Sequence, residues 1–432
     1  MKILYATYWY LPHVGGVNAY LELIKTELLS CGHDVDILAH HPDMDKIYLL
    51  TTGEFVEKAQ IKNVVYQKVL NYYNRYQPYV ETWIRWREIE RYTFELAATL
   101  FRLDHYDLIH TQDLVSTRAL ARVKPKEVPL VATLHGLLAP DYLQRGEITS
   151  KRSLPWRYAC LEEYYGATSA DCTLIPSNYL KEQFKKLGIP VKDLITLPYA
   201  VNREEFERRC RENSDQFIPF VEKGKIAILC PAPLLPSQGH HQLIEALAML
   251  KRKGHTFVCW IAGSGKLDQE LLAMTYRFNL QDDILFLGER PDTAPLIKAC
   301  DIIVLPGLKE NNPYTIMEGH LAGKLVVASR TGSTPELIEH GENGFLYPPK
   351  KSRQLAKVLD KALSERETSL FIARKGYEKG KESWDSKRMI RRLLEIYENL
   401  LQRSSGRREV HHESQNGHPF PIQPNDQPSL SL

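Results

Sequence analysis

A short apolar strand that runs directly into a polar turn and a helix constrains this chain more than any other feature. Residues 302–305 (IIVL) have the length and composition of a parallel strand covered on both faces. A helical pattern follows at about 313–322, Gly323 ends it, and a second apolar run at 325–328 leads into the loop 331–333. Such units collect their loops at the carboxyl edge of one sheet, where ligands bind. The sequence therefore predicts an α/β fold with a ligand site at this edge.

Two carboxylates bracket the turn between the first strand and the helix. Glu310 lies just before the helix and Glu318 lies within it, eight positions later. Asn311 and Asn312 are predicted to cap the helix, and Pro313 suits its first turn. The free backbone N–H groups at a helix start can bind an anion or sugar hydroxyls. The stretch thus combines acidic side chains with amide donors.

The length and charge of the chain narrow its class. At 432 residues it should form two domains, because single cores rarely grow beyond about 250 to 300 residues. The formal net charge is only +3, from 56 basic and 53 acidic residues, which argues against nucleic acid as a partner. The seven cysteines form no CxxC pair and are odd in number, so we expect reduced thiols and no zinc site.

No part of the sequence predicts a membrane span. The chain contains no apolar run of about 18 residues, and a strand at 3–6 follows Met1 and Lys2 directly. We therefore expect a cytoplasmic protein. A peripheral contact of its N-terminal half with the inner face of a membrane is compatible with this expectation.

The N-terminal 41 residues predict a strand, a loop, a helix and a second strand, which is a right-handed βαβ unit. Gly15 and Gly16 precede the helix, and glycines there let the backbone approach a bound group near the positive end of the helix dipole. The loop lacks the G-x-G-x-x-G pattern in a tight first turn. A nucleotide-binding oxidoreductase is therefore disfavoured.

Residues 62–101 leave two interpretations open. A strand is predicted at 64–69, followed by a tyrosine-rich loop and then by a helix rich in tryptophan and arginine, including Trp83 and Trp86. An aromatic and basic helix can lie on an anionic membrane surface. Alternatively, its aromatic rings pack on the sheet while its arginines pair with Glu88 and Glu90.

The E-x(7)-E spacing, the run MEGHLAGKLVVAS and the later GENGFLY resemble the family 4 retaining glycosyltransferases. The resemblance covers about residues 1–402 and implies the GT-B fold, in which two Rossmann-like domains face each other across a nucleotide-sugar cleft. The domains would span 1–200, with a crossover helix at 384–402, and 205–380. Residues 404–432 are polar and rich in Pro, Ser and Gln, which predicts a disordered tail.

The resemblance also implies roles for individual residues. Glu318 would hold the ribose hydroxyls of the donor, Glu310 would contact the sugar hydroxyls, and His135, in a T-L-H-G context, would lie near the transferred sugar, whereas His110 matches a more structural histidine. The diphosphate and sugar would be bound by the backbone around Gly15, Gly16, Gln238, Gly239, Asn311, Asn312 and Thr315. The resemblance also implies that no metal or other cofactor is needed.

The sequence departs from the family pattern at one loop. Where the family has an arginine and a lysine for the donor diphosphate, this chain has Pro233 and Gln238. Charge-assisted contacts to phosphate are about twice as strong as neutral ones. Other cations, such as Lys266, Arg290 or Lys309, would therefore have to replace the two missing charges.

Two hypotheses about function therefore stay open. One is a retaining transferase that moves a hexose-type sugar from a nucleotide-diphosphate donor to a saccharide, lipid-linked or surface-glycan acceptor. The other is a non-catalytic GT-B protein that binds a saccharide or a partner.

Overall fold

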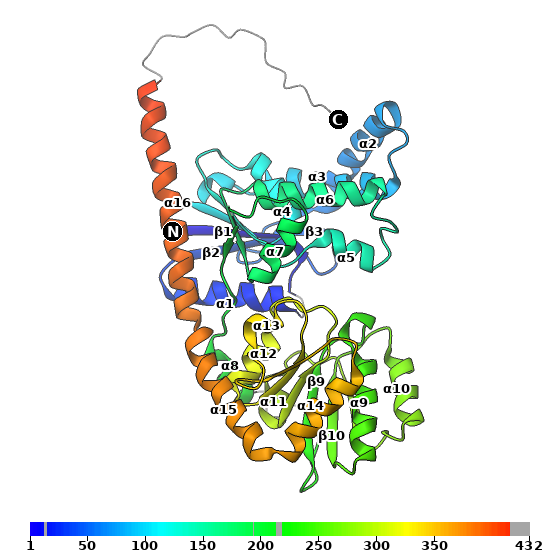
Figure 1. Ribbon diagram of the computed structural model, residues 1–432. Coiled ribbons are helices and arrows are strands. Elements are labelled where there is room, and N and C mark those ends of the chain that lie inside the picture. Colours follow the sequence, from blue (N-terminus) through cyan, green and yellow to red (C-terminus); the bar gives the residue numbers. More distant parts are fainter. Residues whose placement is uncertain (13–14, 193, 213–217, 415–432) are drawn as a thin grey trace.

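The computed structural model describes residues 1–12, 15–192, 194–212 and 218–414, with side chains described through Ser404. Its described residues form two sheets, each with helices on both faces, in two domains that lie one above the other in Figure 1. The last strand of the first sheet ends at Thr196 and the first strand of the second begins at Ile226, so the predicted division at 200–205 falls between them.

The first sheet has the strand order β4-β3-β2-β1-β5-β6-β7-β8. Strands β1, β2 and β5 to β8 are parallel, whereas β3 and β4 are antiparallel additions at one edge. The bounds are β1 Lys2–Tyr10, β2 Asp34–His40, β3 Lys46–Leu49, β4 Phe55–Glu57, β5 Leu108–Thr111, β6 Leu130–Thr133, β7 Cys172–Ile175 and β8 Leu194–Thr196.

Helices cover this sheet on two sides. In Figure 1, α3, α4 and α6 lie above it, while α1 lies below, facing the second domain. The bounds are α1 Gly16–Ser30, α2 Lys58–Tyr76, α3 Thr82–Ala98, α4 Leu114–Val123, α5 Leu138–Gln144, α6 Leu154–Thr168 and α7 Asn178–Lys186. Ser177 caps α7 by accepting a hydrogen bond from the Leu180 N–H.

Helix α2 corrects one prediction. Residues 64–69, expected as a strand, and the tyrosine-rich segment after them lie within a single helix. The apolar residues Ile61 and Val65 are four positions apart and are both buried, so the helical period decides the structure over the β-branched composition of the run.

The second sheet is entirely parallel, with the order β11-β10-β9-β12-β13-β14. The strands predicted at 302–305 and 325–328 are confirmed as β12 and β13. The strands are β9 Ile226–Pro231, β10 Phe257–Ala262, β11 Ile284–Gly288, β12 Ile302–Leu305, β13 Leu325–Ser329 and β14 Phe345–Tyr347. The helices are α8 Arg203–Glu212, α9 His240–Arg252, α10 Asp268–Arg277, α11 Ala294–Ala299, α12 Tyr314–Leu321, α13 Thr334–Leu337, α14 Ser352–Ser364 and α15 Arg366–Ser383.

Helix α16 (Ser386–Ser414) crosses back along the first domain, where it packs on α1 (Figure 1). The buried Tyr397 hydroxyl lies 2.6 Å from the Tyr5 hydroxyl and 2.5 Å from Nδ1 of His110. His110 is therefore part of this anchor. Residues 404–414, predicted as part of a disordered tail, are helical, and residues 415–432 lie outside the described part of the chain.

The two segments that connect the domains run next to each other. The Val201 N–H donates to the Trp384 carbonyl (3.0 Å), and Val201 pairs with Asp385. Glu27 of α1 holds both segments, because its Oε1 accepts from the Asn202 amide (2.8 Å) and from the Ser386 hydroxyl (2.7 Å).

The structure also bears on what the sequence predicts for the cysteines and for membrane spans. All seven cysteines are free thiols, and four of them are buried. Among the described helices, none has the length and apolar composition needed to cross a bilayer.

Candidate active site between the domains

The predicted loops of the second domain meet through close backbone contacts at glycines. Gly239, at the start of α9, has φ 72°, and a Cβ there would lie 2.0 Å from the carbonyl oxygen of Pro306. The Leu308 N–H also donates to the Ser237 carbonyl (2.7 Å). The loop that carries Gln238 is therefore packed directly on the loop that carries Glu310.

The loop after β13 joins the same assembly. At Gly332, whose φ is 59°, a Cβ would lie 1.6 Å from the carbonyl oxygen of Glu310. The Ser333 N–H donates to this carbonyl (3.1 Å). Loops that follow three neighbouring strands are thus brought to one edge of the sheet, as the strand pattern predicts.

The Glu310 carboxylate is partly buried and accepts no hydrogen bond from the described residues. Its Oε1 lies over Gly307, where a Cβ would be only 1.8 Å away, so a larger residue at this position would displace the carboxylate. Burial raises the pKa of Glu310 to about 7. A carboxylate left without protein donors can accept hydrogen bonds from a ligand's hydroxyls.

Glu318 has a different environment. Its Oε1 accepts from the Arg209 guanidinium of α8 (3.1 Å), which also donates to Asp292 (2.9 and 3.2 Å). Burial raises the pKa of Glu318, and the charge of Arg209 opposes this effect. The carboxylate expected to hold the donor ribose is thus already paired with an arginine that the sequence did not single out.

The start of α12 corrects the predicted capping. Pro313 occupies the cap position, and no side chain caps the helix. The amide of Asn311 instead donates to the His135 carbonyl, and that of Asn312 to the Pro176 carbonyl (3.4 Å), so both reach the first domain. Helix geometry leaves the N–H groups of the first turn, at Tyr314 and Thr315, without intrahelical acceptors.

His135 joins an aromatic cluster that spans both domains. Its Nδ1 contacts the Tyr199 hydroxyl, and its Nε2 lies 3.1 Å from Oε1 of Gln112. Since this oxygen can only accept, Nε2 carries the proton and Nδ1 accepts from Tyr199. Burial lowers the pKa of His135 to about 3, so the imidazole is neutral. The Tyr199 ring stacks on that of Tyr314, with centroids 5.2 Å apart.

The predicted glycine loop also reaches this cluster. Gly15 is the cap residue of α1, and Gly16 is its first residue. A Cβ at Gly16 would lie 3.6 Å from the Tyr314 ring. The first turns of α1 and α12 therefore approach each other from opposite domains.

Two further contacts cross between the domains. Lys309 forms an ion pair with Asp141 of α5. The Glu336 carboxylate accepts from the backbone N–H groups of Asn178 (2.9 Å) and Tyr179 (2.5 Å), at the start of α7. Acidic groups are favourable at helix starts. Sequence separations of more than 150 residues hid these partners from any local pattern.

The three cations that could replace the missing arginine and lysine at positions 233 and 238 have different environments. Lys309 is committed to Asp141. Arg290 follows β11 and is partly buried, and its Nε has no hydrogen-bond partner in the described residues. Lys266 is exposed. It follows Gly265, and Gly265 packs against the Leu234 carbonyl.

One group of metal-binding side-chain types lies elsewhere. The ligand atoms of His41, Asp43 and Asp45 all lie within 4.8 Å of one another, between β2 and β3. The two carboxylates are exposed, and the group is not among the residues that join the domains at α12. It adds no chemistry to the site described above.

Comparison with known proteins identifies the family. The model for glycosyl transferases group 1 matches residues 211–379, and that for glycosyltransferase family 4 matches residues 14–205. This chain is a family 4 glycosyltransferase. It is 27% identical, over 401 residues, to an uncharacterised glycosyltransferase of Methanocaldococcus jannaschii, an alignment that covers 89% of this chain and 95% of that protein.

Solved structures show that this family 4 glycosyltransferase has the predicted GT-B fold. Sucrose-phosphate synthase from Thermosynechococcus elongatus superposes with a TM-score of 0.72 at 16% identity, covering 93% of this chain and all of that one. HepE from Anabaena, solved in complex with UDP-glucose, gives a TM-score of 0.63 at 20% identity, covering 92% and 100%.

Proposed function

We propose that this glycosyltransferase moves a hexose-type sugar from a nucleotide-diphosphate donor to a saccharide, lipid-linked or surface-glycan acceptor, with retention of anomeric configuration. The observation that carries the proposal is the partly buried Glu310 carboxylate, to which no described residue donates a hydrogen bond. It precedes α12, which has no side-chain cap and whose first N–H groups lack intrahelical acceptors. The complex of HepE with UDP-glucose supports a nucleotide-sugar donor.

In this proposal the two carboxylates have separate tasks. Glu310 accepts hydrogen bonds from the sugar hydroxyls, and Glu318, which is paired with Arg209, accepts them from the ribose. The N–H groups of Tyr314 and Thr315, with the dipole of α12, stabilise the diphosphate as it gains charge during bond cleavage. No metal or other cofactor is required.

The groups contributed by the first domain bind and orient the sugar. His135 is neutral, and its ring is held by Tyr199 and Gln112. Its carbonyl already accepts from Asn311, so the domains meet next to the proposed sugar position. Arg290, with its unpartnered Nε, is the side chain that we propose as the replacement cation for the diphosphate.

The acceptor would enter from the first domain. We propose that this domain contacts a membrane peripherally, which would give a lipid-linked acceptor access to the enzyme. The aromatic and basic composition of the segment from 58 to 87 supports this contact.

A non-catalytic role in binding a saccharide or a partner is the second candidate. It is favoured by Pro233, which is exposed, and by Gln238, because neither supplies charge to a diphosphate. The two roles differ in donor turnover.

The first test is a calorimetric binding screen with UDP, GDP and ADP, repeated with their sugar conjugates and followed by measurement of donor hydrolysis. We expect one nucleotide to bind, about 10- to 100-fold more weakly in Glu318→Ala because ribose contacts are lost. Glu310→Ala should leave nucleotide affinity within about threefold and lower hydrolysis by about 100-fold.

Glu342→Ala, which changes an exposed carboxylate of the same domain paired only with Lys375, serves as the matched control. Folded protein that binds no nucleotide at millimolar concentration would exclude the transferase. Binding without turnover, unchanged by Glu310→Ala, would favour the non-catalytic role.

A further inference from the structure

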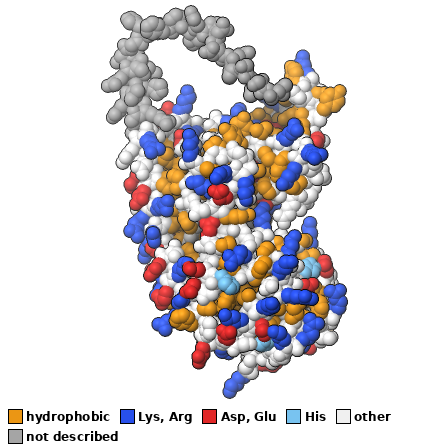
Figure 2. All heavy atoms as spheres, in the orientation of Figure 1, with side chains coloured by type: hydrophobic (Ala, Val, Ile, Leu, Met, Phe, Trp, Pro, Cys, Tyr) orange, Lys and Arg blue, Asp and Glu red, His pale blue; other side chains and the backbone are white. Residues whose placement is uncertain are grey.

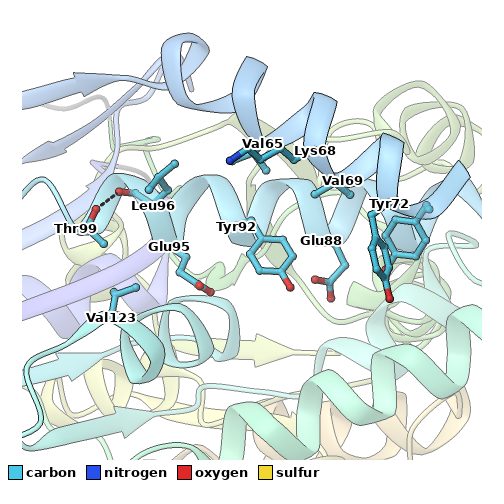
Figure 3. Close-up of a pocket in the computed structure, with 11 residues that line it drawn as sticks. Val65, Lys68, Val69, Tyr72, Glu88, Tyr92, Glu95, Leu96, Thr99 and Val123 are labelled. Atoms are coloured by element: carbon cyan, nitrogen blue, oxygen red, sulfur yellow. Dashed lines mark hydrogen bonds between the residues drawn. The ribbon is translucent and has the colours of Figure 1, made fainter. Parts of the chain in front are cut away.

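A groove with a volume of about 460 Å³ lies between α2 and α3, on the side of the first domain remote from the second (Figures 1 and 3). This size falls within the range of about 300 to 1,000 Å³ that is typical of small-molecule sites. Most of its lining is apolar or aromatic. The groove is lined by Val65, Val69, Tyr72 and other residues of α2, by Tyr92, Leu96 and other residues of α3, and by Thr99 and Val123.

The acidic groups in the groove are already neutralised. Arg91 is buried between Glu88 (2.5 Å) and Glu95 (2.8 Å), and Glu95 also accepts from Arg122 (3.0 Å). This observation favours internal pairing over membrane contact for two of the three arginines of α3, because Arg91 pairs with Glu88 and Glu95 and Arg87 pairs with Glu162. A polar ligand would have to compete with these pairs, whereas an apolar ligand would leave them intact.

The rim of the groove carries basic charge that the protein does not neutralise. Helix α2 contains four cations and no acidic residue. Two of these cations, Lys58 and Lys62, pair with Glu90 of α3. Lys68 and Arg75 are exposed and form no ion pair with the described residues. Arg85 of α3 donates to backbone carbonyls of the α2–α3 turn and to the side-chain oxygen of Asn74 in α2. Glu81 is the one exposed carboxylate in the same turn. The rim therefore carries net positive charge.

Exposed aromatic rings stand beside these cations. The exposed fractions are 54% for Tyr72, 58% for Tyr76 and 96% for Tyr79, and Trp86 is 43% exposed. Figure 2 shows hydrophobic and basic side chains together at the upper right of the molecule, where Figure 1 places α2. Aromatic rings with a polar end, next to cations, are the composition of surfaces that lie at a membrane interface.

We propose that the groove between α2 and α3 binds a hydrocarbon chain of a lipid in an anionic bilayer, while Lys68 and Arg75 contact the headgroups. The inference rests on the membrane contact proposed above but not on sugar transfer. Charge complementarity selects the lipid as occupant, because α2 offers cations and an apolar recess side by side. Lysine is depleted in interfaces between proteins, which disfavours a second copy of the chain.

The headgroup part of the proposal is tested by sedimentation with vesicles. Full-length protein should bind vesicles of phosphatidylcholine with 30% phosphatidylglycerol at least tenfold more tightly than vesicles of phosphatidylcholine alone. Lys68→Glu with Arg75→Glu should weaken binding to the anionic vesicles by at least roughly 30-fold, since loss of each cation near the surface costs about fivefold and the added carboxylates are repelled.

The matched control is Lys357→Glu with Arg374→Glu, which makes the same charge change on exposed residues of α14 and α15 in the second domain. It should bind vesicles like the wild type. Equal binding by both double variants, or equal binding to both kinds of vesicle, would overturn the proposal.

The chain-binding part needs a separate measurement. Anionic vesicles that contain a phosphatidylcholine with a diazirine on its acyl chain are irradiated with bound protein, and labelled peptides are identified by mass spectrometry. Label is expected on groove residues of α2 and α3, such as Val69 and Leu96. Label confined to the turn at 76–79, or absent, would overturn binding in the groove. Nucleotide calorimetry on the same samples reports separately on the proposed transferase.

Discussion

Two loops at the edge of the second sheet fit closely against each other but differ in charge. The loop 232–239 after β9 has lost the expected cations, whereas the loop 306–313 after β12 keeps Lys309 and Glu310. Gly239 nevertheless packs on the Pro306 carbonyl as closely as a residue without a side chain allows. The comparison shows that the shape of this edge depends on backbone fit at glycines, and that its charge is set independently by the neighbouring side chains.

Restoring charge to the first loop should give the largest effect. If the loop retains the shape of a diphosphate site, Pro233→Arg with Gln238→Lys should raise kcat/KM for the donor by about 100-fold, since each charged contact contributes about 1.5 to 3 kcal/mol. Steady-state donor hydrolysis measures this. An unchanged rate would show that another cation, such as Arg290, already contacts the diphosphate. In that case the double variant should raise the rate in an Arg290→Ala background.

The fit between the loops can be tested at Gly239. Gly239→Ala should lower the free energy of unfolding by about 3 kcal/mol or more, because it adds a backbone penalty at φ 72° and a clash with the Pro306 carbonyl. Gly323→Ala is the matched control: φ is 69° there, but a Cβ would have no neighbour within 4 Å, so the cost should stay near 1 kcal/mol. Urea unfolding measures both. Equal losses would mean that the loops are not packed as described.

The second loop should make stability depend on pH through Glu310. Its pKa is about 7 in the folded protein and about 4.5 when unfolded, so the folded state binds the proton more tightly and stability falls as pH rises between these values. Glu310→Gln removes this dependence. Between pH 5 and pH 8 the wild type should therefore lose about 1 to 3 kcal/mol of unfolding free energy more than the variant does. Unfolding curves at the two pH values provide the measurement, and parallel shifts of both proteins would contradict it.

The smallest effect on stability is expected from removing Lys309, the residue of the second loop that pairs with the first domain. Lys309→Met removes the pair with Asp141, which is partly exposed, and should change the free energy of unfolding by less than about 1 kcal/mol. Nucleotide affinity should change by less than about threefold. A larger loss of affinity would show that Lys309 leaves Asp141 to contact the diphosphate.

Local patterns predicted the elements that carry the proposed site. The strand, turn and helix around Glu310 follow from a buried apolar run, a polar turn and a stop at Gly323. The same reasoning failed at α2, where a run of β-branched residues concealed a helical spacing that is visible only from the buried positions Ile61 and Val65.

The partners within the site could not be predicted in this way. Arg209 reaches Glu318 across 109 positions, and Asn311 reaches His135 across 176. Both contacts depend on how separate elements are arranged in space, and neither Arg209 in its charged helix nor Asn311 before Pro313 carries a local signal of its partner. The expected helix caps were wrong for the same reason, since the asparagines bind the opposite domain.

The paired connection between the domains also has a mechanical consequence. The segments at Val201 and Asp385 are bridged to each other, and both are held by Glu27. If the second domain rotates, we therefore expect this paired connection to act as the axis of rotation. Residues near this axis travel little during rotation. Helix α5, which carries the Lys309 partner Asp141, lies on the side opposite α16 in Figure 1, so it would be far from such an axis. In the proposed transferase, the path of a donor bound at α12 would then be set by backbone pairing that is remote from the proposed sugar position.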